Sequence, residues 1–345
     1  MNIRRFRYSL GGFETLAGEQ AILPTLRRNR LNYLLVPFFL LSEFIATLYL
    51  VKRKQIDSIH AHWLLPQGLI AALVNLITGV PFLVTAHGAD VYGLRGGLPA
   101  ALKRFILKRA SQVTAVSRDL AARIDDLVPG LPVVVIPMGV DATVFRPDLF
   151  NQAIRQRHNI VGELLLFVGR LSEKKGVRYL LEAMTKVVER LPDVKLMVIG
   201  KGELEGDLRC LVNQLELSDK VIFMGAIPNH ELPVYYATAD LFAGPSITTA
   251  CGDTEGFGLT FVEAGLSGCM VIGTRTGGIG DIIEDGKTGF LVEEKESDAL
   301  SETIIMVLTS YAQKSEFCLN ARQRLKSSFD WHIIAGKYGA LLEDI

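Results

Sequence analysis

Short β-rich apolar runs alternate with helical patterns along nearly the whole chain, and this alternation constrains the fold more than any other feature. The strand-like runs are IDSIHAH, PFLVTAHG, SQVTAVS and PVVVIPMGV, followed by LLLFVGR, VKLMVIG, VIFMGA, DLFAGPS, MVIGTR and GFLVE. Helical patterns, such as those at 67–76 and 100–110, separate most of them. Strands that alternate with helices form parallel sheets covered on both faces. The sequence therefore predicts an α/β protein.

The chain has enough apolar residues to fill two such domains. It has 345 residues, of which 49% are hydrophobic, and this is too long for one average domain. A polar connection near 145–159 divides the strand-like runs into two series. We predict two doubly wound, Rossmann-like domains that face a cleft, covering residues 1–147 and 148–328. Ligands of this architecture bind beyond the carboxyl ends of the strands.

Cysteine usage indicates the cellular compartment, and the charge distribution indicates which kinds of partner are possible. The four cysteines have no CxxC or metal-finger spacing and follow no signal-peptide pattern, which predicts a reducing, cytoplasmic compartment. Residues 1–150 carry 17 Lys and Arg against 10 Asp and Glu, whereas 151–345 carry 20 against 27. A basic first half suits an anionic partner such as a membrane face or a phosphorylated acceptor, and a merely solvated surface fits equally well. Nucleic acid is not expected, because the basic residues are not interleaved with aromatic ones.

The segment 31–51, LNYLLVPFFLLSEFIATLYLV, is about as long as a membrane span and ends in KRK. Pro37 and Glu43 interrupt it, and a strand pattern follows almost at once. We favour an ordinary buried helix here. A helix lying on a membrane surface and a transmembrane span remain open as alternatives.

The stretch FVGRLSEKKG places two cations between a strand and a helix. The strand ends at Gly169, Arg170 and Lys175 follow, and a helical run begins behind them. Arginine can grip two oxygens at once, lysine adds a compact charge, and the helix N-terminus favours an anion. A diphosphate fits this pattern, although surface charges that cap a loop would give the same sequence.

The stretch VIGKGELEGDL is a second strand followed by Gly-x-Gly. We expect Gly200 and Gly202 to form a tight turn at the cleft. Without a third correctly spaced glycine this is not a dinucleotide fingerprint, and an NAD-dependent dehydrogenase is therefore disfavoured.

The stretch EGFGLTFVEAGL places acids on both sides of a glycine pair. Gly256 and Gly258 let a ligand approach the backbone, and the N–H groups of residues 257–259 are unpaired at the start of the expected helix. Glu255 and Glu263 can accept hydrogen bonds from ligand hydroxyls. Alternatively, Glu255 caps the helix and Glu263 pairs with a neighbouring cation.

These motifs together resemble those of the retaining family 4 glycosyltransferases of the GT-B fold. EGFGLTFVE matches the E-x7-E motif, and FVGRLSEKKG and GTRTGGIGDIIEDGKTGFLV accompany it in order. HAHWLLPQG, TAHGADVY and VIPMGVDATVF look like the N-terminal domain of that family. The closing SFDWHIIAGKYGALLEDI looks like its final helices. The resemblance covers nearly the whole chain and implies that 329–345 packs back towards the first domain.

The resemblance also implies a role for each matching residue. Arg170 and Lys175 would hold the donor diphosphate and stabilise the charge that develops on it. Glu263 would bind the ribose, and Glu255 with the 257–259 backbone would hold the transferred sugar. The base would lie near Gly225 and Ile227, and His87 near the reacting sugar. The implied catalytic residues are Arg170, Lys175, Glu255 and His87, and the implied donor-binding residues are Glu263, Gly256, Phe257, Gly258, Leu259, Gly169, Gly200 and Ile227.

Two more histidines, His60 and His62, alternate on the IDSIHAH strand. They should therefore share a face of that strand. A structural role and a functional role are both open for them.

The implied chemistry is front-face substitution with retention. Retaining glycosidases use one of two carboxyl groups as a nucleophile, but here neither glutamate is expected on the far face of the sugar ring. The leaving phosphate would help to deprotonate the acceptor hydroxyl. No DxD motif or His/Asp cluster suggests a metal, and two cations can supply the positive charge instead. We expect metal-independent transfer, with no cofactor beyond the nucleotide-diphosphate sugar as donor substrate.

One departure from the family concerns the N-terminus. The family opens with a strand and a glycine-rich loop, whereas this chain begins MNIRRFRYSLGGFETLAGEQ. Gly11 and Gly12 follow no strand pattern, so we do not interpret them as that loop. The chain is expected to be either truncated or reduced in its N-terminal domain.

The expected function is transfer of a sugar from a nucleotide-diphosphate donor to a lipid-linked or surface-polysaccharide acceptor. It would take place in the cytoplasm, at the inner face of the cytoplasmic membrane, which the basic first domain would contact. Two alternatives remain: a nucleotide-sugar epimerase, and a nucleotide-sugar-binding protein that has lost catalysis.

Overall fold

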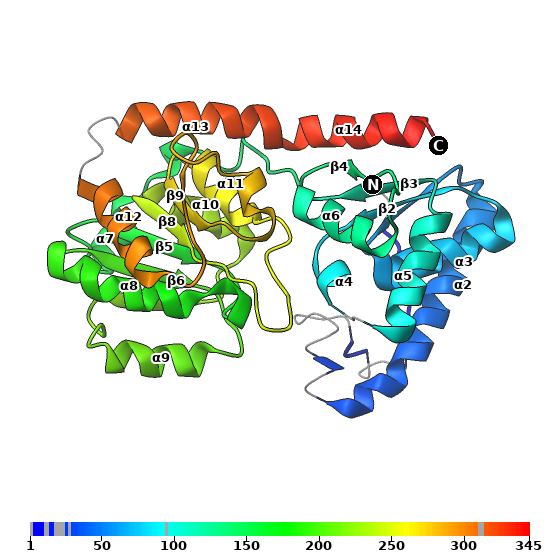
Figure 1. The fold of residues 1–345 in the computed structure, drawn as a ribbon, viewed down its shortest axis with the longest axis horizontal. Coiled ribbons are helices and arrows are strands. Elements are labelled where there is room, and N and C mark those ends of the chain that lie inside the picture. The colour runs from blue at the N-terminus through cyan, green and yellow to red at the C-terminus, as the bar shows by residue number, and fades with distance from the viewer. Residues whose placement is uncertain (1–2, 10–13, 17–24, 27–28, 94–95, 310–313) are drawn as a thin grey trace.

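The computed structural model describes residues 3–9, 14–16, 25–26, 29–93, 96–309 and 314–345. Gly11 and Gly12 lie outside these ranges. The described chain forms two separate parallel sheets, one in each half of the molecule (Figure 1). The first sheet has the order β1-β2-β3-β4, with β1 at Ile59–His62, β2 at Phe82–Ala86, β3 at Gln112–Ala115 and β4 at Val134–Val135.

The second sheet has six strands in the order β10-β9-β8-β5-β6-β7. Its strands are β5 (Leu164–Val168), β6 (Lys195–Ile199), β7 (Val221–Gly225), β8 (Leu241–Gly244), β9 (Met270–Thr274) and β10 (Phe290–Val292). Every residue of β2, β5 and β9 is buried, as expected for parallel strands covered on both faces. The predicted fold of two parallel α/β domains is confirmed.

One predicted strand is much shorter than expected. PVVVIPMGV pairs with β3 only through Val134 and Val135. Pro132 and Pro137 flank this pair, and proline has no backbone N–H to donate to a neighbouring strand. The chain therefore leaves the sheet after two residues.

Helices cover the sheets with apolar faces. In the first domain these are α3 (Leu69–Thr78), α4 (Ala89–Tyr92), α5 (Gly97–Arg109) and α6 (Arg118–Leu127). In the second they are α7 (Gln152–Arg157), α8 (Val177–Arg190), α9 (Glu205–Gln214), α10 (Leu232–Thr238), α11 (Leu259–Leu266) and α12 (Ser297–Thr309). Helix α8 is an example, because its apolar residues recur at helical spacing and so form one buried face. These residues are Val177, Leu180, Leu181, Met184 and Val187.

The last two helices span both halves of the molecule (Figure 1). Helix α13 (Lys314–Phe329) packs on α11, and α14 (Trp331–Glu343) continues over the first domain. The ring of Tyr338 lies 5.0 Å from that of His60. The backbone N–H of Val140 donates to the carbonyl of Phe329 at 2.8 Å. The end of the chain thus contacts elements of both domains.

The apolar segment near residue 31 forms η1 (Arg30–Leu35) and α2 (Val36–Lys54). One side of α2, including Phe44 and Leu48, packs on Ile70 and Val74 of α3. Only 11% of its most apolar window is buried, although the helix Leu31–Lys54 is long and apolar enough to cross a membrane. The expectation of an ordinary buried helix is therefore wrong, because α3 covers one side of α2 and the other side is exposed.

The carboxyl group of Glu43 lies on the covered side of α2. Its Oε2 and the Oε1 of Gln67 are both buried without a hydrogen-bond partner in the described structure. Burial raises the pKa of Glu43 to about 7, and a hydrogen bond from the Gln67 side chain lowers it by a smaller amount. Burial thus favours the uncharged, protonated form of Glu43 relative to an exposed glutamate.

This arrangement predicts a stability that depends on pH. Because the folded protein binds the Glu43 proton more tightly than the unfolded chain, the stabilisation is complete below about pH 4.5 and is lost as pH rises through about 7. We expect the urea midpoint of the parent to fall between pH 6 and pH 8, and that of Glu43→Gln to fall less. Glu316→Gln, at an exposed position of α13, serves as the control. Equal pH slopes for all three proteins would contradict the assignment.

Candidate functional site

The loop after β5 is held against the end of β8. Gly169 and Arg170 follow the strand, η4 spans Glu173–Lys175, and α8 begins after Gly176. Gly176 has φ +62°, and a Cβ on it would lie 1.9 Å from the carbonyl oxygen of Pro245. Only glycine fits at this contact. The close approach fixes where the loop presents its cations.

Arg170 is paired with a carboxylate from the next strand-end loop. Its Nη2 lies 3.1 Å from Oε2 of Glu203, and both side chains are about half exposed. The two loops touch through their backbones, because a Cβ on Gly200 would lie 1.9 Å from the carbonyl oxygen of Gly169. Glu203 was not predicted as a partner, although its place directly after the Gly-x-Gly turn was a usable signal.

Lys175 reaches across to the mouth of α11. Its Nζ lies 2.5 Å from Oε2 of Glu255, and the two side chains are only 18% and 13% exposed. The Cε of Lys175 lies 3.6 Å from the position that a Cβ on Gly169 would take. Burial would raise the pKa of Glu255, but the charges of Lys175 and Lys174, together with hydrogen bonds, hold it below its usual value. Glu255 is thus an ionised partner of Lys175 and does not cap the helix.

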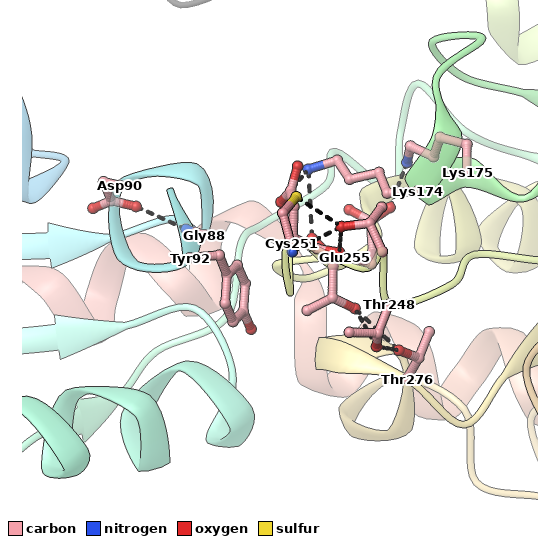
Figure 2. Close-up of polar contacts among 12 residues, drawn as sticks. Gly88, Asp90, Tyr92, Lys174, Lys175, Thr248, Cys251, Glu255 and Thr276 are labelled. Atoms are coloured by element: carbon pink, nitrogen blue, oxygen red, sulfur yellow. Dashed lines mark hydrogen bonds and ion pairs between the residues drawn. The ribbon is translucent and has the colours of Figure 1, made fainter. Parts of the chain in front are cut away.

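A second lysine joins this cluster. The Nζ of Lys174 lies 3.2 Å from Asp253 and 3.4 Å from the carbonyl oxygen of Thr254. Figure 2 shows Lys174, Lys175 and Glu255 side by side, opposite the first-domain segment that carries Gly88 and Tyr92. Sequence reasoning passed over Lys174, even though it stands next to Lys175.

The loop before α11 is fastened by threonine hydroxyls. The hydroxyl of Thr276 lies 2.9 Å from that of Thr248 and 3.0 Å from that of Thr254 (Figure 2). These contacts connect the loop after β8 to the loop after β9. The backbone on which Glu255 sits is therefore fixed on two sides.

The second acid of the motif lies inside the helix. Helix α11 begins at Leu259, after Gly258 with φ +103°, as the sequence predicted. Oε2 of Glu263 accepts a hydrogen bond from the buried Tyr236 hydroxyl at 2.8 Å. Burial raises the pKa of Glu263, and Tyr236 and Lys175 oppose this only in part. Tyr236 carried no signal in the sequence, because the contact depends on how α10 packs on α11.

Phe257 and Gly256 connect the motif to the rest of the molecule. The buried Phe257 ring lies 5.7 Å from that of Phe329. A Cβ on Gly256 would lie 2.3 Å from the carbonyl oxygen of His87 in the first domain. The two domains also meet where the Arg118 N–H donates to Asp281 at 2.6 Å. The glycine motif is thus part of the contact between the domains.

Three histidine rings form a row behind this contact. The rings of His60 and His62 lie 4.2 Å apart, so the predicted shared face is confirmed. Nδ1 of His62 lies 2.9 Å from Nε2 of His87. Burial, together with its histidine neighbours, lowers the pKa of His60 to about 4, and burial also lowers the pKa of His62 and of His87. All three imidazoles are therefore neutral at pH 7.

Asp90 holds the His87 loop. Its carboxylate accepts hydrogen bonds from the backbone N–H groups of Leu64, His87 and Gly88 at 2.8–3.1 Å. The sequence HGAD carried this signal, since an aspartate at a helix start commonly binds backbone N–H groups. We did not identify it from the sequence.

Gly225 and Ile227, implied to lie near the base, differ in their contacts. Gly225 joins the cluster, because its carbonyl accepts from the Gly200 N–H at 2.8 Å. Ile227 is partly buried and packs on the hydrophobic core. Within the described residues, no group of three or more His, Cys, Asp or Glu side chains is placed to hold a metal ion.

Solved structures place this arrangement in the GT-B class. The chain superposes on sucrose-phosphate synthase of Thermosynechococcus elongatus with a TM-score of 0.77 at 24% identity, covering 91% of this chain and 78% of that one. It superposes on Anabaena HepE, solved in complex with UDP-glucose, with a TM-score of 0.75 at 23% identity, covering 95% and 90%. The chain thus has the GT-B fold of two parallel α/β domains.

Family models give the identification. The model of the glycosyl transferases group 1 matches residues 150–324, and that of Glycosyltransferase Family 4 matches residues 11–144. The chain belongs to the group 1 glycosyl transferases and is a GT-B glycosyltransferase.

Two curated relatives, both named for sugar-transfer or sugar-conjugate synthesis, are about equally similar to this chain. A GDP-mannose-dependent alpha-(1-6)-phosphatidylinositol monomannoside mannosyltransferase of Mycolicibacterium smegmatis is 28% identical over 298 residues, covering 85% of this chain and 78% of its own. The N-acetyl-alpha-D-glucosaminyl L-malate synthase of Bacillus anthracis is 27% identical over 300 residues, covering 85% and 76%.

Proposed function

We propose that this glycosyltransferase is a retaining, metal-independent hexosyltransferase that uses a nucleotide-diphosphate sugar. The observation that carries the proposal is the convergence of three motifs. Lys175 of the β5 loop binds Glu255 at the mouth of α11, and the next residue, Gly256, touches the backbone of His87. The Lys175–Glu255 pair and the backbone of the His87 loop therefore both adjoin the Gly256 turn, and this supports a donor site there.

Each charged group has a role in this proposal. Arg170 and Lys175 bind the donor diphosphate, which replaces the carboxylates of Glu203 and Glu255 as their partner. Glu255 is then free to accept hydrogen bonds from the transferred sugar. Glu263, oriented by the Tyr236 hydroxyl, binds the ribose. His87, neutral and held by His62, can donate or accept one hydrogen bond at a sugar hydroxyl.

The transfer step is a front-face substitution. The bond between the anomeric carbon and the phosphate oxygen breaks, and the bond to the acceptor oxygen forms on the same face of the ring. The acceptor proton passes to the leaving phosphate oxygen. Arg170 and Lys175 stabilise the negative charge on that phosphate. Glu255 and Glu263 are not assigned as nucleophiles, because the family resemblance puts neither of them on the far face of the sugar ring and gives both of them hydroxyl-binding roles.

The names of similar proteins suggest the substrate classes. HepE was solved with UDP-glucose, and the mycobacterial relative is named for GDP-mannose and a phosphatidylinositol mannoside. We propose a nucleotide-sugar donor and a lipid-linked or surface-polysaccharide acceptor, met by a cytoplasmic enzyme at the inner face of the membrane. The excess of basic residues in 1–150 supports the second half of this proposal.

A thermal-shift panel tests the donor site. UDP, GDP, ADP and their sugars are added to the parent, to Arg170→Ala and to Glu263→Ala. A nucleotide at a hundred times its Kd stabilises the fold by about 2.7 kcal/mol, and we expect both variants to raise the Kd of the best nucleotide at least about tenfold. Arg324→Ala is the control, because Arg324 forms a similarly exposed pair with Glu284 at 2.9 Å.

Three results would contradict the proposal. Unchanged Kd values in Arg170→Ala and Glu263→Ala would show that the site is misplaced. Binding without transfer to any lipid or glycan acceptor would favour a binding protein without catalysis. An altered sugar released without acceptor would instead indicate an epimerase.

A further inference from the structure

The outer face of α2 and the turn before it carry an exposed row of large apolar side chains. Leu34, Phe38, Leu41, Ile45 and Tyr49 follow one another at intervals of three or four residues, so they lie on one side of the helix. Between 49% and 69% of each is exposed. The opposite side packs on α3. A helix that is apolar on both sides, with one side open to water, indicates an interaction surface.

Basic side chains flank this row at both ends. Lys52, Arg53 and Lys54 close the helix and are exposed. At the other end, Phe6 and Tyr8 pack on Phe39 with ring centroids 5.3 and 5.2 Å away. Their neighbours, the exposed Arg4, Arg5 and Arg7, therefore lie beside the first half of α2. Within the described residues, none of these six cations forms an ion pair with a carboxylate.

The single acid of α2 points away from this face. Glu43 is turned towards Gln67 on the covered side. The described part of α2 thus presents apolar side chains and positive charge on its exposed face, and the nearby Glu14 accepts a hydrogen bond from the Tyr8 N–H at 3.1 Å. This combination is complementary to an anionic lipid surface, whose headgroups attract cations while its acyl boundary accepts apolar side chains.

A groove at the end of the helix has the same character. Ile45, Leu48 and Tyr49 form its apolar part, Lys52 and Arg53 line its end, and its volume is ≈ 580 Å³. The guanidinium of Arg53 lies 5.4 Å from the centre of the Tyr49 ring. The apolar part is complementary in character to an acyl chain, and the two cations are complementary in charge to a phosphate.

We propose that the outer face of α2, from Leu34 to Lys54, is a membrane-docking surface that lies flat on an anionic phospholipid bilayer. The helix does not cross the bilayer, because its other side is already packed on α3. Figure 1 shows α2 along the lower right edge of the molecule, away from the second sheet, so docking leaves that domain free. The proposal specifies the membrane contact of the proposed function, but binding to lipid does not require transfer activity.

Vesicle co-sedimentation of the full chain tests this surface. The parent is mixed with phosphatidylcholine vesicles that contain or lack phosphatidylglycerol. We expect at least about tenfold stronger binding to the anionic vesicles, and loss of that excess at high salt. The double variant Leu41→Glu/Ile45→Glu and the triple variant Lys52→Glu/Arg53→Glu/Lys54→Glu should each weaken binding at least about tenfold. Leu319→Glu, at a 66% exposed position on α13, is the matched control and should bind as the parent does.

The outcomes separate the alternatives. Parent-like binding by both multiple variants would overturn the proposal, as would equal binding to neutral and anionic vesicles. A parent dimer that the Leu41→Glu/Ile45→Glu variant converts to a monomer, without any vesicle binding, would show that a second copy covers the face. Resistance to extraction by alkaline carbonate would show a span instead of a docked helix. Because the Lys52–Lys54 positions are exposed, the triple variant tests the charge even if the apolar variant misfolds. Nucleotide binding is measured in a separate assay, so a failure of the docking proposal does not bear on the proposed donor site.

Discussion

Replacing Lys175 with methionine is expected to lower kcat/KM for sugar transfer by about 10²–10³-fold, the effect typical of losing one preorganised group that stabilises developing charge. Methionine keeps most of the apolar stem and removes the ammonium. It also leaves Glu255 buried without its partner, and breaking such a pair costs about 3 kcal/mol of stability. Activity and stability should therefore fall together in this variant.

A double variant separates the two effects. In Lys175→Met/Glu255→Gln the buried charge is gone, so most of the stability should return while the transfer rate stays low. Lys186→Met, which removes an exposed lysine paired with Asp298 at 2.8 Å, is the control and should keep parental activity. In the proposed mechanism Arg170 and Lys175 supply the positive charge, so the parent is also expected to keep its rate in EDTA. A Lys175→Met enzyme with normal kcat/KM, or an EDTA-treated parent revived by Mg²⁺ or Mn²⁺, would contradict the mechanism.

The Lys175–Glu255 pair also shows what the sequence could and could not provide. Periodicity identified both strand ends, because apolar runs mark buried strands and the polar residues that follow mark their carboxyl ends. It could not show that residues 80 positions apart pair with each other. The same holds for Tyr236 and Glu263, whose contact depends on the packing of two helices. Local patterns predict which residues reach the site, and tertiary packing decides which of them touch.

The prediction that α2 is a buried helix failed for a different reason. Its apolar residues were visible in the sequence, and we took them as evidence of burial. Apolarity on every side predicts only that each side needs an apolar neighbour. Whether that neighbour is α3, a lipid surface or another chain depends on where the helix sits in the domain. Here one side is covered by α3, and the exposed row on the other side became visible only in three dimensions.

Gly256 is another residue whose role the sequence could not show, because that role depends on how the two domains are arranged. The sequence suggested that glycine allows a ligand to approach. The structure adds that a Cβ there would lie 2.3 Å from the carbonyl oxygen of His87 and 3.2 Å from the Cα of Gly88. Both neighbours are backbone atoms, which cannot turn aside as a flexible side chain can. An added methyl group must therefore displace one of the two backbones, and we expect the displacement to separate the two domains.

Gly256→Ala is consequently expected to lower kcat about 10²-fold or more, since a displacement of about 1 Å is enough to cost that much when reacting groups come from both sides. Small-angle scattering should show a larger radius of gyration for the unliganded variant, while each domain core stays folded. Gly280→Ala is the matched control, because a Cβ at Gly280 in η6 (Gly277–Asp281) meets no atom within 4 Å. Parental kcat in Gly256→Ala would show that the contact between His87 and Gly256 does not set the geometry of transfer. A low kcat with an unchanged radius of gyration would instead indicate that the added methyl group disturbs the position of the bound sugar and not the arrangement of the domains.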